Sequence, residues 1–90
     1  MTRATLADNK IQKLVKELCN MVRQRFPEAE FEVYEGYEPR GVYIHAYTQA
    51  DDFLGVMDVV STRMAEIIEE EGVIVAVIPL PMKKDGNAAQ

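Results

Sequence analysis

The single histidine is the residue best suited to chemistry near neutral pH. His45 alternates with Tyr43 and Tyr47 in the 90-residue chain. An imidazole changes its protonation between pH 5 and 8, so it can serve as a general base or bind a ligand. Nucleophilic catalysis would also need a serine or cysteine at a suitable spacing, and none is present. We therefore predict no catalytic residue and assign Tyr43, His45 and Tyr47 to a contact surface for a ligand or a partner.

Metal and disulfide chemistry are limited by composition. One cysteine and one histidine exclude an intramolecular disulfide, a cysteine-based zinc cage and any site that needs two imidazoles. Asp51 and Asp52 are adjacent, and neighbouring helical residues point about 100° apart, so the two carboxylates do not share a face. We predict no metal site and no cofactor. A lone Cys19 in a chain without an export signal indicates the cytoplasm.

The segment 36–41 offers a possible anion site. Gly36 and Gly41 bound a predicted six-residue hairpin loop, where glycine can take positive φ and Pro39 can fix a turn. Backbone N–H groups together with Arg40 can hold an anion in such a loop. The other interpretation, an exposed arginine in an ordinary hairpin loop, is the commoner one.

The charge distribution argues against nucleic acid and membranes. The net charge is −5, with six basic and two acidic side chains in residues 1–25, and two basic and twelve acidic ones in residues 26–72. A basic helix packed beside an acidic one explains this pattern, and nucleic-acid binding is not expected of an acidic chain. The longest uncharged stretch, Val73–Met82, is shorter than the roughly 20 residues of a membrane-spanning helix.

The first half of the chain predicts a helix and a hairpin. Apolar residues recur at spacings of three and four over 5–26, which indicates an amphipathic helix that Pro27 ends. Thr5 and Asp8 have the spacing of a capping box at its start. Residues 29–35 and 42–47 alternate apolar and polar side chains, which predicts two strands joined by the 36–41 loop.

The second half predicts a helix followed by a strand. The helix begins at Thr48 or Gln49, has Asp51 and Asp52 in its first turn, and ends at Gly72. Its apolar stripe contains Phe53, Leu54, Val56, Met57, Val60, Met64, Ile67 and Ile68. Three glutamates, 69–71, stand at its C-terminus, where negative charge is unfavourable. The β-branched run 73–78 predicts a buried strand that Pro79 and Pro81 end.

These elements predict a single α+β domain over residues 1–82, followed by a flexible tail, 83–90. The order α-β-β-α-β favours a two-layer sandwich in which both helices cover one face of a mixed three-stranded sheet. The other face then shows Glu30, Glu32, Tyr34 and the residues around His45 beside an aliphatic row of the last strand. A small monomer seldom exposes so much apolar surface to solvent, which predicts a homodimer or a protein partner on that face. The alternatives are a surface for a ligand or peptide, and cover by the chain's own tail.

The stretch 26–80 resembles the minimal nucleotidyltransferase domains of prokaryotes. The likeness lies in the leading helix and in the segments EFEVYEG, GVYIHAYT, QADDFLGVMDVV and EEEGVIVAVIPL. In that family a serine follows the glycine, and three strand aspartates hold magnesium for nucleotidyl transfer. Here Tyr37 follows Gly36, and Tyr43 and His45 stand where the Asp pair belongs. The resemblance implies an inactive relative that binds a nucleotide or phosphate near Arg40.

A type II KH domain also begins with a helix and two strands, but it needs a Gly-x-x-Gly loop between helices, which this sequence lacks. The sequence therefore predicts a non-catalytic domain that acts by self-association or partner binding through the open sheet face. The alternative is the inactive nucleotidyltransferase-like module. The candidate ligand-binding residues are Arg40, Tyr43, His45 and Tyr47.

Overall fold

The computed structural model describes residues 8–49 and 52–82 and contains the five predicted elements in the predicted order. Helix α1 spans Asn9–Arg25 and helix α2 spans Phe53–Glu71. The strands are β1 (Glu30–Tyr37), β2 (Arg40–Thr48) and β3 (Val75–Pro81). Neither helix of this described part is long and apolar enough to cross a membrane.

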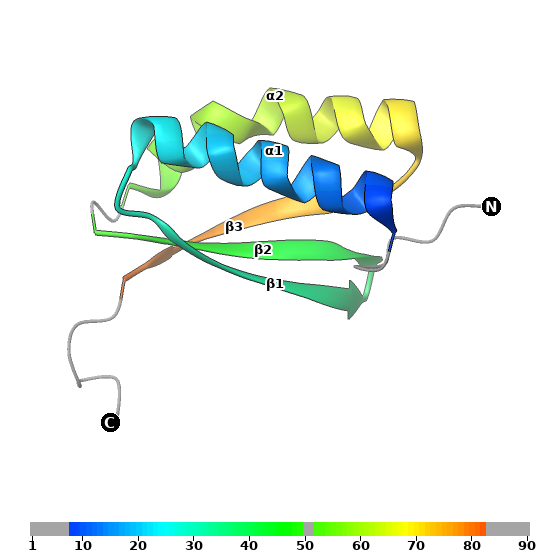
Figure 1. Ribbon diagram of the computed structural model, residues 1–90, viewed down its shortest axis with the longest axis horizontal. Coiled ribbons are helices and arrows are strands. Elements are labelled where there is room, and N and C mark those ends of the chain that lie inside the picture. The colour runs from blue at the N-terminus through cyan, green and yellow to red at the C-terminus, as the bar shows by residue number, and fades with distance from the viewer. Residues whose placement is uncertain (1–7, 50–51, 83–90) are drawn as a thin grey trace.

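The three strands form one mixed sheet with β2 in the centre (Figure 1). Strand β1 pairs antiparallel with β2, with His45 opposite Glu32 and Tyr43 opposite Tyr34. Strand β3 pairs parallel with β2, with His45 opposite Ile78. The parallel pairing requires a crossover, and α2 supplies it. The predicted α+β fold with a mixed sheet is thus confirmed.

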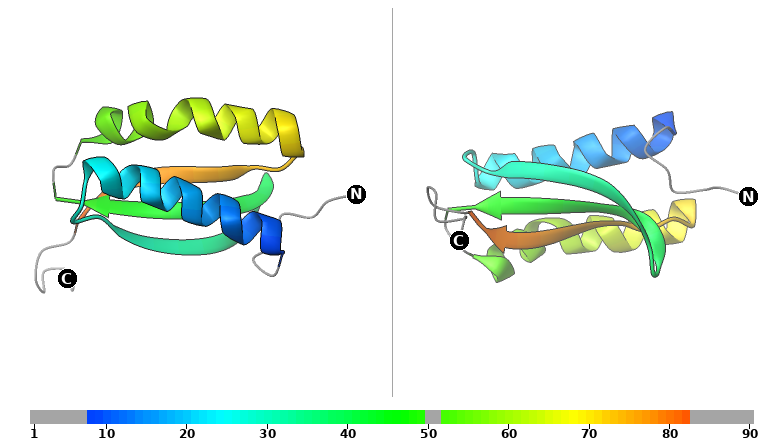
Figure 2. Two further views of the ribbon diagram at one scale, coloured as in Figure 1. Left: turned by 45° about the horizontal axis from the view of Figure 1, so that its top comes forward. Right: turned by 90° about the horizontal axis from the view of Figure 1, so that it is seen from below.

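Both helices lie on the same face of the sheet, and no element of residues 8–49 and 52–82 covers the opposite face (Figures 1 and 2). The alternation along the strands directs Val42, Ile44 and Ala46 of β2 toward the helices, where they are fully buried. The rest of the core comes from both helices, β3 and the segments that join the elements. Its members are Ile11, Leu14, Leu18, Cys19, Val22, Phe26, Ala29, Val56, Val60, Ile67, Val73, Val75 and Val77.

Each helix begins one residue after an aspartate, and both starts correct the predicted ones. Asp8 is the N-cap of α1, because its carboxylate accepts hydrogen bonds from the N–H groups of Lys10 and Ile11. The predicted capping box instead made Thr5 the N-cap and placed Asp8 three residues into the helix. Thr5 lies outside the described residues. Asp52 is the N-cap of α2 and accepts from the N–H of Gly55 at 2.8 Å.

Thr48 and Gln49 therefore do not begin the second helix. Thr48 is the last residue of β2, is 2% exposed and pairs with Pro81 of β3. The prediction for Asp51 falls outside the described residues. At the other end of α2 the prediction is confirmed, because Gly72 has φ +70° and its N–H donates to the carbonyl oxygen of Ile68.

The hairpin loop is shorter than predicted. Strands β1 and β2 stay paired as far as Tyr37 and Arg40, so the turn consists of Glu38 and Pro39, joined by a cis peptide bond. Gly36 and Gly41 face each other inside the strands, and neither has positive φ. Their role is to leave space: a Cβ at Gly41 would lie 2.8 Å from the Cβ and the carbonyl oxygen of Ile74.

Pro79 and Pro81 continue β3 instead of ending it. The N–H of Val42 donates to the carbonyl oxygen of Ile74, and the N–H of Met82 donates to that of Thr48. The even-numbered residues of β3 therefore direct their backbone groups toward β2, and the odd-numbered ones direct theirs to the outer edge. Proline is compatible with an edge position because no ladder hydrogen bond is lost there.

Helix α2 buries a narrower stripe than predicted. Val56, Val60 and Ile67 are fully buried, whereas Phe53, Leu54 and Ile68 are 56%, 75% and 49% exposed. Two helical positions turn through about 200°, so Leu54 lies opposite Val56, and Ile68 lies about 100° from Ile67. The prediction that Phe53, Leu54 and Ile68 belong to the core stripe was wrong.

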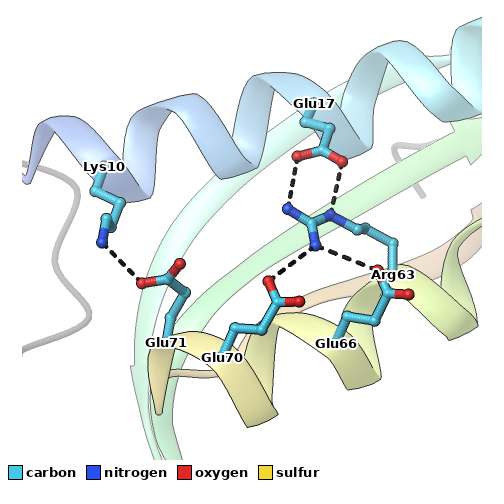
Figure 3. A network of polar contacts seen from close by, with 6 residues as sticks. All are labelled: Lys10, Glu17, Arg63, Glu66, Glu70 and Glu71. Carbon is cyan, nitrogen blue, oxygen red and sulfur yellow. Dashed lines mark hydrogen bonds and ion pairs between the residues drawn. The ribbon is translucent and has the colours of Figure 1, made fainter.

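Ion pairs account for two of the three glutamates at the end of α2, Glu70 and Glu71 (Figure 3). Arg63 of α2 donates through Nε and Nη2 to the two carboxylate oxygens of Glu17 of α1, at 2.7 and 3.2 Å. Its Nη1 lies 3.3 Å from Glu66 and 3.5 Å from Glu70. Lys10 of α1 binds Glu71 at 2.9 Å. The Arg63–Glu17 and Lys10–Glu71 pairs hold the helices together over the sheet, and the hydrogen bond to Glu71 raises the pKa of Lys10.

We expect Arg63→Met to lower the midpoint of urea unfolding, because three glutamates then lose a shared cation and the bidentate bond to Glu17. Arg25→Met is the matched control, since the Arg25–Asp58 pair is long at 3.8 Å and both side chains are mostly exposed. The effect of Arg63→Met should shrink in 1 M NaCl. Equal effects of the two substitutions would contradict a bridging role for Arg63.

Candidate functional site: the open face of the sheet

The face of the sheet opposite the helices is organised in three stripes that run along the strands. We call them the acidic stripe of β1, the aromatic stripe of β2 and the aliphatic stripe of β3. The acidic stripe is Glu30 and Glu32 with Tyr34 at its end; the aromatic stripe is Tyr43, His45 and Tyr47; the aliphatic stripe is Ile74, Ala76, Ile78 and Leu80. The register places Glu32, His45 and Ile78 in one row across the sheet. We refer to the three stripes together as the open face, which Figure 2 shows from below.

A chain of polar contacts joins the acidic and aromatic stripes. The hydroxyl of Tyr34 lies 3.0 Å from Nε2 of His45, and the hydroxyl of Tyr47 donates to Glu32 at 2.8 Å. The other ring nitrogen of His45, Nδ1, lies 3.5 Å from the Tyr47 hydroxyl and 3.7 Å from Oε1 of Glu32. Tyr34 and Tyr47 also meet the imidazole edge-on. These contacts fix the four side chains in one arrangement.

The contact with Glu32 changes the acidity of Tyr47. A phenol that donates to a carboxylate loses that hydrogen bond on ionisation and then faces a like charge. The hydrogen bond to Glu32 therefore raises the pKa of Tyr47, with smaller contributions from burial and from the charge of Glu32. Tyr47 remains a neutral hydrogen-bond donor throughout the physiological pH range.

Tyr43 is held across the hairpin. Its hydroxyl donates to the carbonyl oxygen of Pro39, and its ring stacks on that of Tyr34 with centroids 5.7 Å apart. A Cβ at Gly36 would lie 2.5 Å from the edge of this ring. Gly36 is therefore required as the surface on which the Tyr43 ring lies, and it is required for lack of a side chain rather than for its backbone freedom.

Two open hollows flank His45 on this face. The larger, about 300 Å³, is at the hairpin end and is lined mainly by aromatic and aliphatic groups: Tyr34, Gly36, Tyr37, Glu38, Pro39, Tyr43 and Ile78. The smaller, about 220 Å³, is at the other end and is lined by Glu30, Glu32, Tyr47 and Met82. The first suits an apolar group, and the second suits a cation.

The structure brings three of the four sequence-predicted site residues together. Tyr43, His45 and Tyr47 form the aromatic stripe, but Arg40 belongs to the opposite face in the alternation along β2. The Arg40 guanidinium lies over the Tyr37 ring, 5.5 Å from its centre, and Arg40 lines neither hollow. Because the turn has only two residues, Arg40 belongs to β2, and the alternation of the strand directs it away from the aromatic stripe. The longer loop that was predicted to hold an anion does not form.

Sequence reasoning missed two contributors to the site. Tyr37 and Met82 line the hollows, whereas the sequence predicts a loop at Tyr37 and makes Met82 only the last residue of the domain. No sequence signal extends the hairpin to Tyr37, because only the register of the strands shows that Gly36 pairs with Gly41. The lone Cys19 lies in the core, where burial raises the pKa of its thiol and makes it unreactive. Within residues 8–49 and 52–82, no three acidic, histidine or cysteine side chains cluster as metal ligands.

Comparison with known proteins identified no relative of this chain. No family model matches the sequence, and neither a curated protein nor a solved structure matches it significantly. The resemblance to minimal nucleotidyltransferases therefore stays a prediction. Function has to be argued from the open face itself.

We expect Glu32→Gln to lower the pKa of Tyr47 toward the ordinary tyrosine value of about 10. The stability that this hydrogen bond contributes is fully present below that value, and it is lost as pH rises through the higher pKa of the folded state. Tyrosine ring NMR shifts followed from pH 8 to 12 measure the change, with Glu69→Gln as the control. A Tyr47 titration unchanged by Glu32→Gln would contradict the contact.

We expect Gly36→Ala to destabilise the fold by about 1–3 kcal/mol, because the new methyl group overlaps the Tyr43 ring. In the background of Tyr43→Ser the same substitution should cost much less, since the overlapping ring is gone. Urea unfolding of the four proteins of this double-mutant cycle measures the coupling. Equal costs in both backgrounds would show that Gly36 is needed for a different reason.

Proposed function

We propose that this protein is a binding module that acts by association through the open face of its sheet. The observation that carries the proposal is the composition of that face: three tyrosines and a histidine lie beside the aliphatic stripe, and no described helix covers them. Aromatic side chains of this kind dominate the energetics of protein interfaces. A contiguous apolar patch on a small domain marks an interaction site.

The open face is also prepared for binding. The contacts of His45 with Tyr34, and of Tyr47 with Glu32, fix these side chains before a partner arrives. Association through fixed aromatic side chains loses little side-chain entropy, which is a main cost of forming an interface. The open face is not flat, because it has a hollow at each end. A partner can insert side chains into both hollows.

Phosphate or nucleotide binding receives less support. Among the described residues whose side chains share the open face, none is lysine or arginine. Arg40 stands apart beside Tyr37. Association is thus the better proposal. We further propose that the protein acts in the cytoplasm, because reducing conditions suit a chain with one free buried thiol.

The test compares two isoleucine-to-aspartate variants of the full chain. Ile78→Asp puts a charge in the aliphatic stripe, whereas Ile68→Asp does the same on the exposed side of α2. We expect Ile78→Asp to weaken association at least about tenfold and Ile68→Asp to leave it unchanged. Sedimentation velocity measures self-association, and affinity capture followed by reconstitution with the purified partner measures association with another protein.

Circular dichroism and urea unfolding establish that each variant folds. Should Ile78→Asp fail to fold, Tyr43→Asp makes the same test on the aromatic stripe. The proposal fails if the open-face variants and Ile68→Asp associate as the unmodified protein does.

A further inference from the structure

We infer that the open face binds a basic amphipathic helix of a partner protein and not a second copy of this chain. This inference rests on the proposed function and names the occupant of the same face. It is carried by the order of the three stripes, because charge lies on one side of the open face and aliphatic surface on the other. A matching surface must place a basic edge and an apolar edge side by side.

The fixed charges of the open face have one sign. Its carboxylates are Glu30 and Glu32, and none of the described side chains on the face is lysine or arginine. His45, whose Nδ1 lies 3.7 Å from Glu32, supplies a cation only when it is protonated. The Glu32 side chain is 69% exposed even with Tyr47 as its hydrogen-bond partner. Burying such carboxylates against an uncharged surface would cost free energy, so the partner has to supply the cations.

A second copy cannot satisfy this requirement by packing sheet to sheet. With a twofold axis parallel to the strands, the acidic stripe of each copy would face the aliphatic stripe of the other, which leaves Glu30 and Glu32 buried without counter-charge. With the axis across the strands, acidic stripe would face acidic stripe, and the carboxylates would repel one another. Both aligned arrangements are unfavourable.

Helix α1 of another copy does not fit either. Its solvent side is basic, with Lys13 and Lys16 beside Asn9 and Gln12 around an open hollow. It has the charge that the acidic stripe requires, but these four residues give no apolar edge to cover Ile78 and Leu80. Helix α1 of another copy would therefore leave the aliphatic stripe uncovered.

The dimensions of the open face suit a helix that lies along the strands. Three strands about 4.8 Å apart span about 10 Å, which is close to the diameter of a helix with its side chains. From Glu30 to Gly36 the sheet extends about 20 Å, the length of roughly 13 helical residues. An apolar stripe over β2 and β3 would fill the larger hollow, and a lysine or arginine would enter the hollow beside Glu30, Glu32 and Tyr47.

The probes for this inference are two 16-residue amphipathic peptides with the same leucine stripe. One carries lysine and the other carries glutamate at every polar position. Each is titrated into the ¹⁵N-labelled full chain at low salt, and amide shifts locate the binding site. We expect the Leu/Lys peptide to shift residues 30–34, 43–47 and 76–80, and to bind at least about tenfold tighter than the Leu/Glu peptide.

Charge-reversal variants make the assignment specific. We expect the double variant Glu30→Lys with Glu32→Lys to bind the Leu/Lys peptide at least about tenfold more weakly than the unmodified protein does, and to bind the Leu/Glu peptide more tightly. The matched control is Asp58→Lys with Glu69→Lys on α2, which reverses the same charge on another surface and keeps the Arg63 contacts. This control should change the affinity for the Leu/Lys peptide by no more than about twofold once added salt has screened long-range charge effects.

Three results would overturn the inference. The first is that the Leu/Lys peptide shifts only the amide signals at the acidic end of α2 and none on the open face. Both peptides could bind the open face equally, which would leave the proposed function standing and remove the charge preference. Sedimentation could show a dimer that Ile78→Asp dissociates, which would make a second copy the occupant. If neither peptide bound and Ile78→Asp changed no association, the proposed function itself would fail.

Discussion

The structure depends on the burial of one face of a three-stranded sheet beneath two helices. Val42, Ile44 and Ala46 of the central strand are fully buried there, and both helices direct their apolar stripes onto this layer. Two helices cannot also cover the second face, so the side chains of that face meet solvent or a partner. Alternation along each strand divides the residues between a core and a surface, and the same alternation sets the order of the stripes on the open face.

The remaining contacts keep this two-layer arrangement in one register. Arg63 and Glu17 hold the helices side by side, and Lys10 with Glu71 repeats the link at the end of α2 (Figure 3). On the open face of the sheet, Gly36 leaves room for the Tyr43 ring, and Gly41 leaves room for Ile74. Pro79 and Pro81 remove two N–H donors from the outer edge of β3, which discourages the addition of a further strand there.

Much of this fold could be predicted because periodicity determines which face a side chain occupies. The alternation of 29–35 and 42–47 placed Tyr34, Tyr43 and His45 on one surface before any pairing was known. The strand limits could not be predicted, since Pro79 and Pro81 are tolerated only where β3 is an edge strand with their positions turned outward. The hairpin was similarly misjudged, because two glycines predict a loop unless the register that pairs them is known. Arg40 was assigned to the site for that reason. The glutamates of α2 required knowledge of which residues of α1 lie across from them.

The central claim is that the open face of the isolated chain is bare and available to a partner. Solvent paramagnetic relaxation with a soluble, uncharged gadolinium chelate measures this directly on the ¹³C-methyl and aromatic signals of the full chain. The account predicts clear relaxation at the half-buried Ile78, Leu80, Tyr43 and Tyr47, weaker than at Ile68, which is 49% exposed, and stronger than at the buried Ile44 and Val77. Protection of the first four side chains to the level of the core would contradict it, because the face would then already be covered.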